Sequence, residues 1–245
     1  MQFGIFYIVQ WHESRTQEQA LREALEQIEL ADQLGIDEVW LGEHHFSRHG
    51  LLSGLFSFAG HVAARTRRMR IGTAVSVLPF HNPIVVAEEA AMLDILSGGR
   101  LNFGVGSGYQ RQEFDGLGVP IDESRARFEE GLEQVRRLLE EENVTARGRF
   151  HSFENATSLP RPTQKPRPPF WIAALSTRET FETAGALGHY LMGIPLGGAQ
   201  MAGLLKSYRD AWTAAGHPGR GKVMLAFHMY CAETTAQAAA VARAP

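Results

Sequence analysis

The sequence predicts an α/β fold, a (β/α)8 or TIM barrel, and three observations lead to this prediction. Short apolar segments of strand composition alternate with helices long enough to cross back over a sheet, which is typical of parallel βαβ units. Seven such units follow one another within 245 residues, and this barrel usually has about 250. No glycine-rich dinucleotide fingerprint follows the first strand, so a doubly wound open sheet is the second choice.

The first four units occupy residues 2–142. The segment Gln2–Val9 is short and too apolar to have one wet face, so we expect a buried strand. Helix Gln17–Gly35 carries apolar residues at helical spacing and ends in a glycine suited to a left-handed C-cap. The other expected strands are Glu38–Gly42, Arg70–Leu78 and Leu101–Val105, and the other expected helices are Leu55–Met69, Pro83–Leu96 and Glu123–Glu142.

The remaining units begin at residue 170. Their expected strands are Phe170–Leu175, Tyr190–Ile194 and Val223–Ala232, and their expected helices are Arg178–Gly188, Ala199–Ala215 and one that starts at Thr235. Residues 143–169 interrupt the alternation with a hairpin that turns at Arg147-Gly148 and a proline-rich stretch, which we interpret as an insertion. We therefore expect a single domain over residues 1–245. An eighth βα unit is missing, so either the polypeptide continues or another element closes the barrel.

Composition and charge exclude several classes of protein. Lys and Arg number 24 against 27 Asp and Glu, and the net charge of −3 gives no electrostatic case for binding nucleic acid or an anionic membrane. The single cysteine, Cys231, excludes an intrachain disulfide and fits a reducing compartment. No apolar run reaches the roughly 20 residues that span a bilayer, and the N-terminus lacks the basic region of a signal peptide. We therefore expect a soluble, cytoplasmic protein.

Candidate functional residues gather where the strands end, because the catalytic groups of a parallel barrel lie at the carboxyl ends of its strands. The run Glu43-His44-His45 follows the second strand, and a histidine near neutral pH can accept or donate a proton. Two interpretations of these histidines stay open, a functional pair or buried side chains bonded to backbone carbonyl groups. Histidines and aromatic residues share these loops, which suits a flat aromatic ligand with polar edges.

Two of the strand-end loops are candidate phosphate sites. Ser107 lies in the run GVGSGYQ, where backbone N–H groups can face an anion, although such glycines also serve purely steric needs. Ser176 or Thr177 is a natural N-cap for the helix after the fifth strand, and a helix N-terminus attracts phosphate. Lys and Arg are few in these loops, so backbone and hydroxyl groups would hold most of a phosphate.

The stretch from Val39 to Arg127 resembles the bacterial luciferase-like flavin monooxygenases. The matching segments are VWLGEHHFSRHGLL, RIGTAVSVLPFHNPIVVAEEAAMLDILSGGRLNFGVGSGYQRQEF and ESRARFEE, and weaker similarity continues through PPFWIAALSTRET. The resemblance implies a (β/α)8 barrel that binds reduced FMN delivered by a separate flavin reductase. It further implies that O2 converts this flavin into a C4a-hydroperoxide, which oxygenates an aldehyde or another organic substrate while the protein excludes water.

The resemblance also assigns roles to residues of this chain. His44 matches the catalytic histidine of the family, a general base or acid near the flavin, and Glu43 matches a residue that shapes the pocket. Ala74-Val75 match a pair joined by a non-prolyl cis peptide that supports the isoalloxazine ring, and Ser176 matches a phosphate-binding serine. The full set of expected cofactor-binding residues is Glu43, Ala74, Val75, Gly106, Ser107, Tyr109, Ser176 and Thr177.

The chain departs from the pattern of the luciferase α-subunit after the fourth strand. Gly106 stands where that pattern has a reactive cysteine, and Ser107 stands where it has an arginine that grips the phosphate. Tyr109 or Arg111 would then compensate. The catalytically silent β-subunit lacks the first histidine of the EHH run, so the presence of His44 favours an active chain. Light emission does not follow from the resemblance.

Three other functions stay open. A deazaflavin-dependent hydride-transfer enzyme would share the fold and react without O2, and a non-catalytic subunit would bind flavin without oxygenating a substrate. A metal hydrolase would use His12, His44 and His45, but the first strand lacks the paired histidines of such barrels, and we expect no metal.

The expected partners are a small hydrophobic organic substrate, O2, the reductase and, since relatives commonly dimerise, a second copy of the chain. The apolar pocket candidates are Phe6, Tyr7, Trp11, Phe46, Phe80 and Met192.

Overall fold

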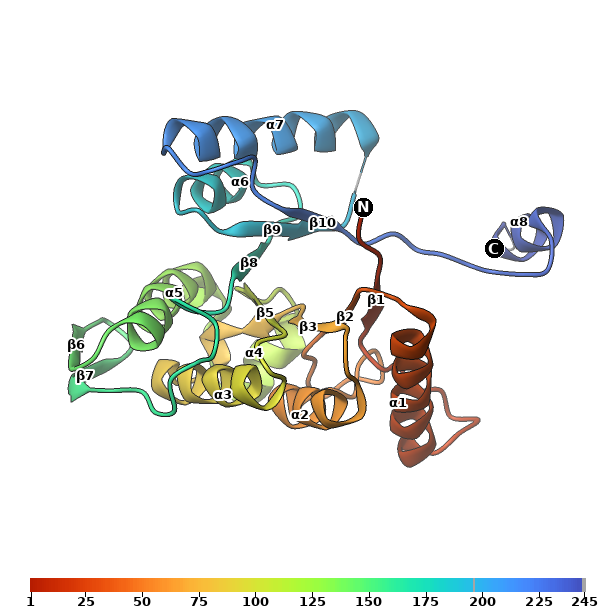
Figure 1. Cartoon of the computed structure of the whole chain (residues 1–245), viewed down its shortest axis with the longest axis horizontal. Coiled ribbons are helices and arrows are strands. Elements are labelled where there is room, and N and C mark those ends of the chain that lie inside the picture. Colours follow the sequence, from red (N-terminus) through yellow and green to blue (C-terminus); the bar gives the residue numbers. More distant parts are fainter. Residues whose placement is uncertain (196, 244–245) are drawn as a thin grey trace. The chain divides into compact units, whose positions relative to one another are not determined.

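The computed structural model of the chain describes residues 1–195 and 197–243, which fall into two compact units. The first unit comprises residues 1–173 and 188–190, and the second comprises residues 174–187 and those described from 191 onward. The first unit contains the greater part of the parallel sheet, and the second contains the last helices (Figure 1). The expectation of a single domain stays a prediction.

The first unit is built on a parallel sheet with the strand order β1-β2-β3-β5-β8. These strands are β1 (Gly4–Tyr7), β2 (Glu38–Leu41), β3 (Arg70–Thr73), β5 (Leu101–Gly106) and β8 (Phe170–Ala173). A short strand, β4 (Ser76–Val77), also pairs with β5 in parallel. Because each strand runs parallel to the one before it, the chain must return along the sheet each time, which confirms the predicted βαβ alternation.

Helices provide these return connections. They are α1 (Gln17–Leu34), α2 (Leu55–Arg65), α3 (Pro83–Leu96) and α5 (Ser124–Glu140). The four helices contact one another in this order along the outside of the sheet (Figure 1). Thr16 begins α1 with a capping box that includes Gln19, and Gly35 ends it at a φ of 94°, the left-handed stop that the sequence predicts.

The first and third strands differ from their predictions. β1 is not buried on both faces: Phe6 is 43% exposed, because in the described part of the chain β1 pairs with β2 alone. The segment expected as one strand over 70–78 is two strands, since pairing stops after Thr73 and resumes at Ser76. A single 3-10 turn, η1 (Leu78–Phe80), then leads to α3.

The sequence pattern misses two short elements between β5 and α5. They are helix α4 (Arg111–Leu117) and the 3-10 turn η2 (Ile121–Glu123). Helix α4 is 7 residues long, too short to show a helical period in the sequence. Its Glu113 and Gln112 side chains form hydrogen bonds with the segment after β2.

Residues 143–169 interrupt the alternation as predicted. Strands β6 (Val144–Arg147) and β7 (Ser152–Ala156) form an antiparallel hairpin, and its turn begins at Gly148. The Glu130 carboxylate on α5 accepts hydrogen bonds from the backbone N–H groups of Arg149 and His151 at 2.7 and 2.8 Å. The hairpin is therefore fastened to the helix that precedes it.

The second unit pairs β9 (Tyr190–Gly193) in parallel with β10 (Val223–Leu225) from residue 191 onward. Helices α6 (Arg178–Ala186) and α7 (Gly198–Ala214) pack against each other (Figure 1). At Gly185 the two backbones approach so closely that a Cβ would lie 2.3 Å from the carbonyl oxygen of Tyr208. Glycine at this position is what allows the two helices to pack.

The prediction of a strand over 223–232 is wrong beyond Leu225. Residues 226–232 have no strand pairing, and Phe227 and Met229 are exposed. Helix α8 (Thr235–Ala242) follows them with a capping box at Thr234.

Apart from the short β4, the described residues contain seven parallel strands that each precede a helix in sequence, and an eighth βα unit does not occur among those residues. None of the described helices is long and apolar enough to cross a bilayer.

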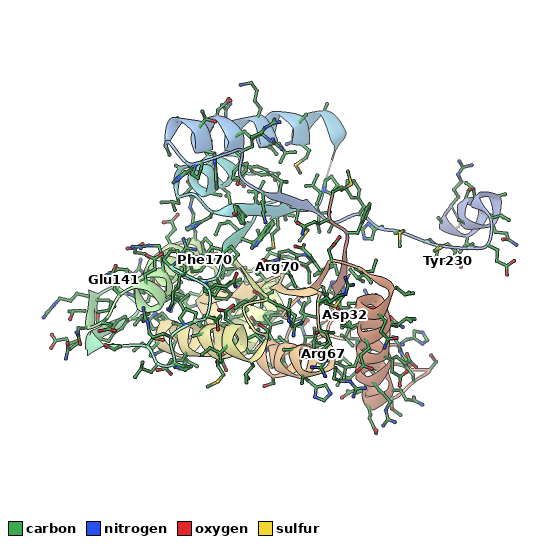
Figure 2. All side chains as sticks on the ribbon, in the orientation of Figure 1. Asp32, Arg67, Arg70, Glu141, Phe170 and Tyr230 are labelled. Carbon is green, nitrogen blue, oxygen red and sulfur yellow. The ribbon has the colours of Figure 1, made fainter. Side chains whose placement is uncertain are left out.

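Asp32, near the end of α1, fixes the start of β3. Its carboxylate accepts hydrogen bonds from the backbone N–H groups of Arg67, Arg68 and Met69 at 2.8, 3.1 and 2.8 Å, and Figure 2 labels Asp32 and Arg67. Burial acts to raise the pKa of Asp32, but the three donors favour the charged form and together hold its pKa below the ordinary value.

We expect Asp32→Asn to lower the free energy of unfolding at pH 7 by about 1–3 kcal/mol, because an amide cannot accept all three N–H groups. The lowered pKa means that wild type keeps this stabilisation above about pH 4 and loses it as the pH falls through the native value. The difference between the two proteins should therefore shrink in acid. Urea unfolding at pH 7 and below pH 4 measures it.

Asp115→Asn is the matched control, because Asp115 is exposed and its ion pair with Arg111 spans 3.4 Å. Such a surface pair contributes little to stability. An equal loss in both variants would contradict the role of Asp32.

Candidate functional site

The site that the structure shows most completely lies in the first unit, where β2, β4 and β5 end. The run Glu43-His44-His45 leaves β2, and the loop after β5 leads into α4. Within this group, Glu43 contacts the chain around β4 and His44 contacts α4. The carboxyl ends of neighbouring parallel strands meet at one edge of the sheet, as the sequence analysis requires.

The peptide bond between Ala74 and Val75 is cis, the geometry that the family resemblance implies. It separates β3 from β4 and is held by the chain on either side: the Ala74 N–H donates to Leu41 O at 2.6 Å, and the Glu43 N–H donates to Val75 O at 3.3 Å. Across from it, a Cβ on Gly106 would lie 2.7 Å from Cγ2 of Val75. The absence of a side chain at 106 therefore makes room for Val75.

Glu43 directs a buried carboxylate at three donors. Its Oε2 accepts the Val77 N–H at 2.9 Å, and its Oε1 lies 2.9 Å from Nε2 of His45 and 2.7 Å from Nε2 of His81. Burial acts to raise the pKa of Glu43, but the hydrogen bonds from His45 and His81 outweigh it and hold the pKa below the ordinary value. The charged Glu43 side chain is therefore a clamp: it connects Val77, His45 and His81, which lie in three different segments.

His81 is the nearest imidazole to the Glu43 carboxylate, at 2.7 Å. Burial acts to lower the pKa of its imidazole, but the hydrogen bond and the charge of Glu43, with the charge of Glu89 beyond, raise the pKa above the ordinary value. His81 is one of the histidines of the strand-end loops, and the sequence alone gives it no partner. Its contact with a carboxylate 38 positions earlier carries no local signal.

His44 is buried and its ring is held by side chains. Its Nδ1 lies 2.9 Å from Oε1 of Glu113 and 3.1 Å from Nε2 of Gln110. The Tyr109 ring meets it edge-on at a centroid distance of 6.5 Å. The nearest hydrogen-bond partner of this histidine is thus a carboxylate, not a backbone carbonyl group. Among the described residues, Nε2 of His44 makes no hydrogen bond and is left for a ligand or solvent.

The loop after β5 presents the other candidates. Gly108 adopts a φ of 75° and makes the turn, Ser107 is half-buried, and Tyr109 is exposed. Arg111 lies beside Asp115 on the outer face of α4, so its charge is already paired. Tyr109 lies nearer to His44, and of the two proposed compensating residues it is the one in contact with the site.

Ser176 and Thr177 belong to the second unit. Thr177 is the N-cap of α6, but its side chain makes no capping hydrogen bond, and both hydroxyl side chains are exposed. The first N–H groups of α6 are therefore not capped by that hydroxyl, which fits an anion as ligand.

The residues of the metal-hydrolase alternative do not converge. His12 lies 2.8 Å from the Ser14 hydroxyl, whereas His44 and His45 face different carboxylates. The described residues contain no group of three or more side chains arranged to hold a metal ion.

The apolar pocket candidates have different surroundings. Phe46 is exposed and its ring lies 5.9 Å from that of His45, and Phe80 packs edge-on against Phe114 at 4.7 Å. Met192 is buried in the second unit, and the Trp11 indole donates to Arg15 O at 2.7 Å. Of these four side chains, Phe46 is the exposed one beside the site.

Comparison with known proteins assigns this arrangement to one family. The sequence model described as luciferase-like monooxygenase matches residues 1–245. The oxygenase component of the flavin-dependent trigonelline monooxygenase of Acinetobacter baylyi is 30% identical over 238 residues, which cover 96% of this chain and 66% of that protein. The chain spans from 40% to 66% of the length of the curated relatives it matches.

Solved structures share the fold. Monooxygenase RslO1 from Streptomyces bottropensis is 38% identical, with a TM-score of 0.93 over 98% of this chain and 75% of its own. Two others are similar in fold alone. They are the oxygenating constituent of 3,6-diketocamphane monooxygenase from Pseudomonas putida in complex with FMN (19% identity, TM-score 0.88, 97% and 69% covered) and an F420-dependent secondary alcohol dehydrogenase (21%, 0.78, 91% and 68%). The fold is that of these TIM-barrel enzymes.

We expect Glu43→Gln to lower the pKa of His81 below its wild-type value. The variant removes the negative charge that stabilises the protonated imidazole, whereas the burial that lowers the pKa remains. In wild type, the stabilisation from protonated His81 is present at low pH and is lost as the pH rises through the raised pKa. NMR titration of the imidazole signals measures the shift.

Glu89→Gln is the matched control for this titration. Glu89 acts on His81 through charge alone and is the smaller influence, so its variant should move the pKa less. A His81 pKa that is unchanged in Glu43→Gln would contradict the interaction between Glu43 and His81.

Proposed function

Because the chain belongs to the family of luciferase-like monooxygenases, we propose that it acts as the oxygenase of a flavin-dependent monooxygenase system. In this proposal it uses reduced FMN and O2 to oxygenate a small hydrophobic organic substrate, such as an aldehyde. The observation that carries the proposal is that two features meet where β2 and β3 end. One is the buried His44 imidazole, whose Nε2 makes no hydrogen bond among the described residues, and the other is the Ala74–Val75 segment, whose Val75 O accepts the Glu43 N–H.

The residues present fit a flavin ring. Ala74 and Val75 would support its face, and Gly106 leaves Val75 the space it needs. Ser107 and Tyr109 would bind from the loop after β5, and Glu43 would hold the bulge in place from behind. When bound, the flavin would supply the activated oxygen, as the C4a-hydroperoxide that the resemblance implies.

The phosphate of FMN is proposed to bind Ser176 and Thr177. Support comes from the N-terminus of α6, which lacks a side-chain cap, and from two exposed hydroxyl groups there. Since the phosphate-gripping arginine of the luciferase pattern is replaced by Ser107, backbone N–H groups and hydroxyls would hold most of the phosphate. Tyr109 is the proposed compensating residue.

His44 is the proposed catalytic residue. Its Nε2 would accept a proton from the reacting groups, or return one, while its Nδ1 stays bonded to Glu113. The His44 ring is buried, and exposed Phe46 supports an apolar substrate nearby.

The proposed partners follow from the same reasoning. The name of the Acinetobacter relative, an oxygenase component, supports a separate flavin reductase. A homodimer and a cytoplasmic location remain predictions from the sequence.

Titration of the protein with FMN, reduced FMN and the deazaflavin F420 tests the cofactor. We expect reduced FMN to bind and the complex to consume O2 in the presence of apolar aldehydes. Tight binding of F420 with hydride transfer in the absence of O2 would instead support the hydride-transfer alternative. Flavin binding without oxygenation of any substrate would support the non-catalytic subunit.

Replacing His44 with alanine should lower turnover by about 10²–10⁴-fold and leave FMN binding unchanged, because the proton acceptor is lost while the contacts to the ring remain. His61→Ala is the control, since His61 is exposed on α2. Steady-state rates and flavin titrations of both variants measure the effect. Turnover of His44→Ala at the wild-type rate would contradict the catalytic role of His44.

A further inference from the structure

Glu113 is a buried acid that no sequence feature singles out. It lies on the short helix α4, only 2% of it is exposed, and its Oε1 lies 2.9 Å both from Nδ1 of His44 and from the backbone N of His45. A buried carboxylate is stable only when donors surround it. Here the donors are the imidazole and the adjacent backbone N–H, so Glu113 binds the two residues that follow Glu43.

Nδ1 of His44 has two competing neighbours. Glu113 can only accept a hydrogen bond from it when ionised, whereas the amide nitrogen of Gln110, at 3.1 Å, can only donate to it. A neutral imidazole nitrogen is either a donor or an acceptor, so one of the two contacts decides where the ring proton sits. The carboxylate is closer, and a charge-assisted hydrogen bond is about twice as strong as a neutral one.

The packing of the ring supports the same orientation. The Cδ2 edge of His44 lies against Gly50, where an added Cβ would stand 2.8 Å from that atom. Turning the ring over would place carbon against the Glu113 oxygen and remove one of the two donors of this buried acceptor, leaving it only the His45 N–H.

We propose that Glu113 is the positioning residue of His44, which holds the imidazole proton on Nδ1 and thereby leaves Nε2 as the nitrogen that exchanges protons with a ligand. The arrangement is a carboxylate–imidazole dyad in which the acid sets the tautomer and the ring orientation. Glu113 itself touches no reacting atom in this proposal.

The catalytic consequence rests on the proposed function, since a base at Nε2 matters only if His44 moves a proton there. The tautomer does not rest on it and can be measured without flavin or substrate.

The experiment is NMR of the protein labelled with ¹⁵N-histidine at a pH where His44 is neutral, with its signals assigned by their loss in His44→Asn. We expect Nδ1 of wild-type His44 to carry the proton and Nε2 to show the shift of an unprotonated nitrogen. A proton found on Nε2 in the wild type would overturn the proposal, whatever any variant does.

Three variants separate a positioning role of Glu113 from a general structural one. In Glu113→Leu, Gln110 becomes the nearest polar group to Nδ1, so the proton should move to Nε2 in most molecules. Gln110→Ala removes the other neighbour and should leave the proton on Nδ1. Glu113→Gln retains a carbonyl oxygen that can accept from Nδ1 and should restore the wild-type tautomer in part, which keeps the test usable if the leucine variant does not fold. No tautomer change in a folded Glu113→Leu variant would overturn the proposal.

Activity distinguishes this proposal from the one it rests on. If both hold, Glu113→Leu lowers kcat by about tenfold or more with the KM for reduced FMN little changed, and Glu113→Gln recovers part of the loss. If the protein does not oxygenate at all but the wild-type proton is on Nδ1, the proposed function fails and the role of Glu113 in setting the tautomer stands.

Discussion

The candidate site depends on one buried charge, the carboxylate of Glu43. It accepts a hydrogen bond from the Val77 N–H, and Nε2 of His45 and of His81 lie within hydrogen-bond distance of it. A single side chain therefore joins the end of β2 to β4 and to the turn before α3. A carboxylate removed from water must be satisfied by such donors, and loss of any one leaves the charge exposed to an apolar interior. The position of His44, the next residue, follows from that anchoring.

Much of the fold could be predicted from the sequence because the signals are local. Periodicity gives α1 and α3 almost to the residue, and Gly35 marks the end of α1 through its backbone conformation. Composition also predicts the order of strands and helices and their parallel pairing. The exposed face of β1 could not be predicted, because burial depends on which strands lie beside it, and apolar composition does not report that.

The site was predicted in part. The sequence points to Glu43 and His44 because they follow a strand, and the family resemblance points to Ala74-Val75. The sequence does not reveal Glu113, because 69 positions separate it from His44 and α4 is too short to be recognised. Polar contacts between distant loops arise from tertiary packing, so a single sequence carries no period or motif that announces them.

The glycine at 106 has a consequence for how this region can vary. A Cβ there would overlap Cγ2 of Val75, so the end of β5 and the segment between β3 and β4 share one small volume at these two positions. A larger residue at 106, such as the cysteine of the luciferase pattern, fits only beside a shorter one at 75. Across the family, a larger side chain at one of these two positions should therefore accompany a smaller one at the other. Substituting only one of them with the residue of another member would create a steric clash.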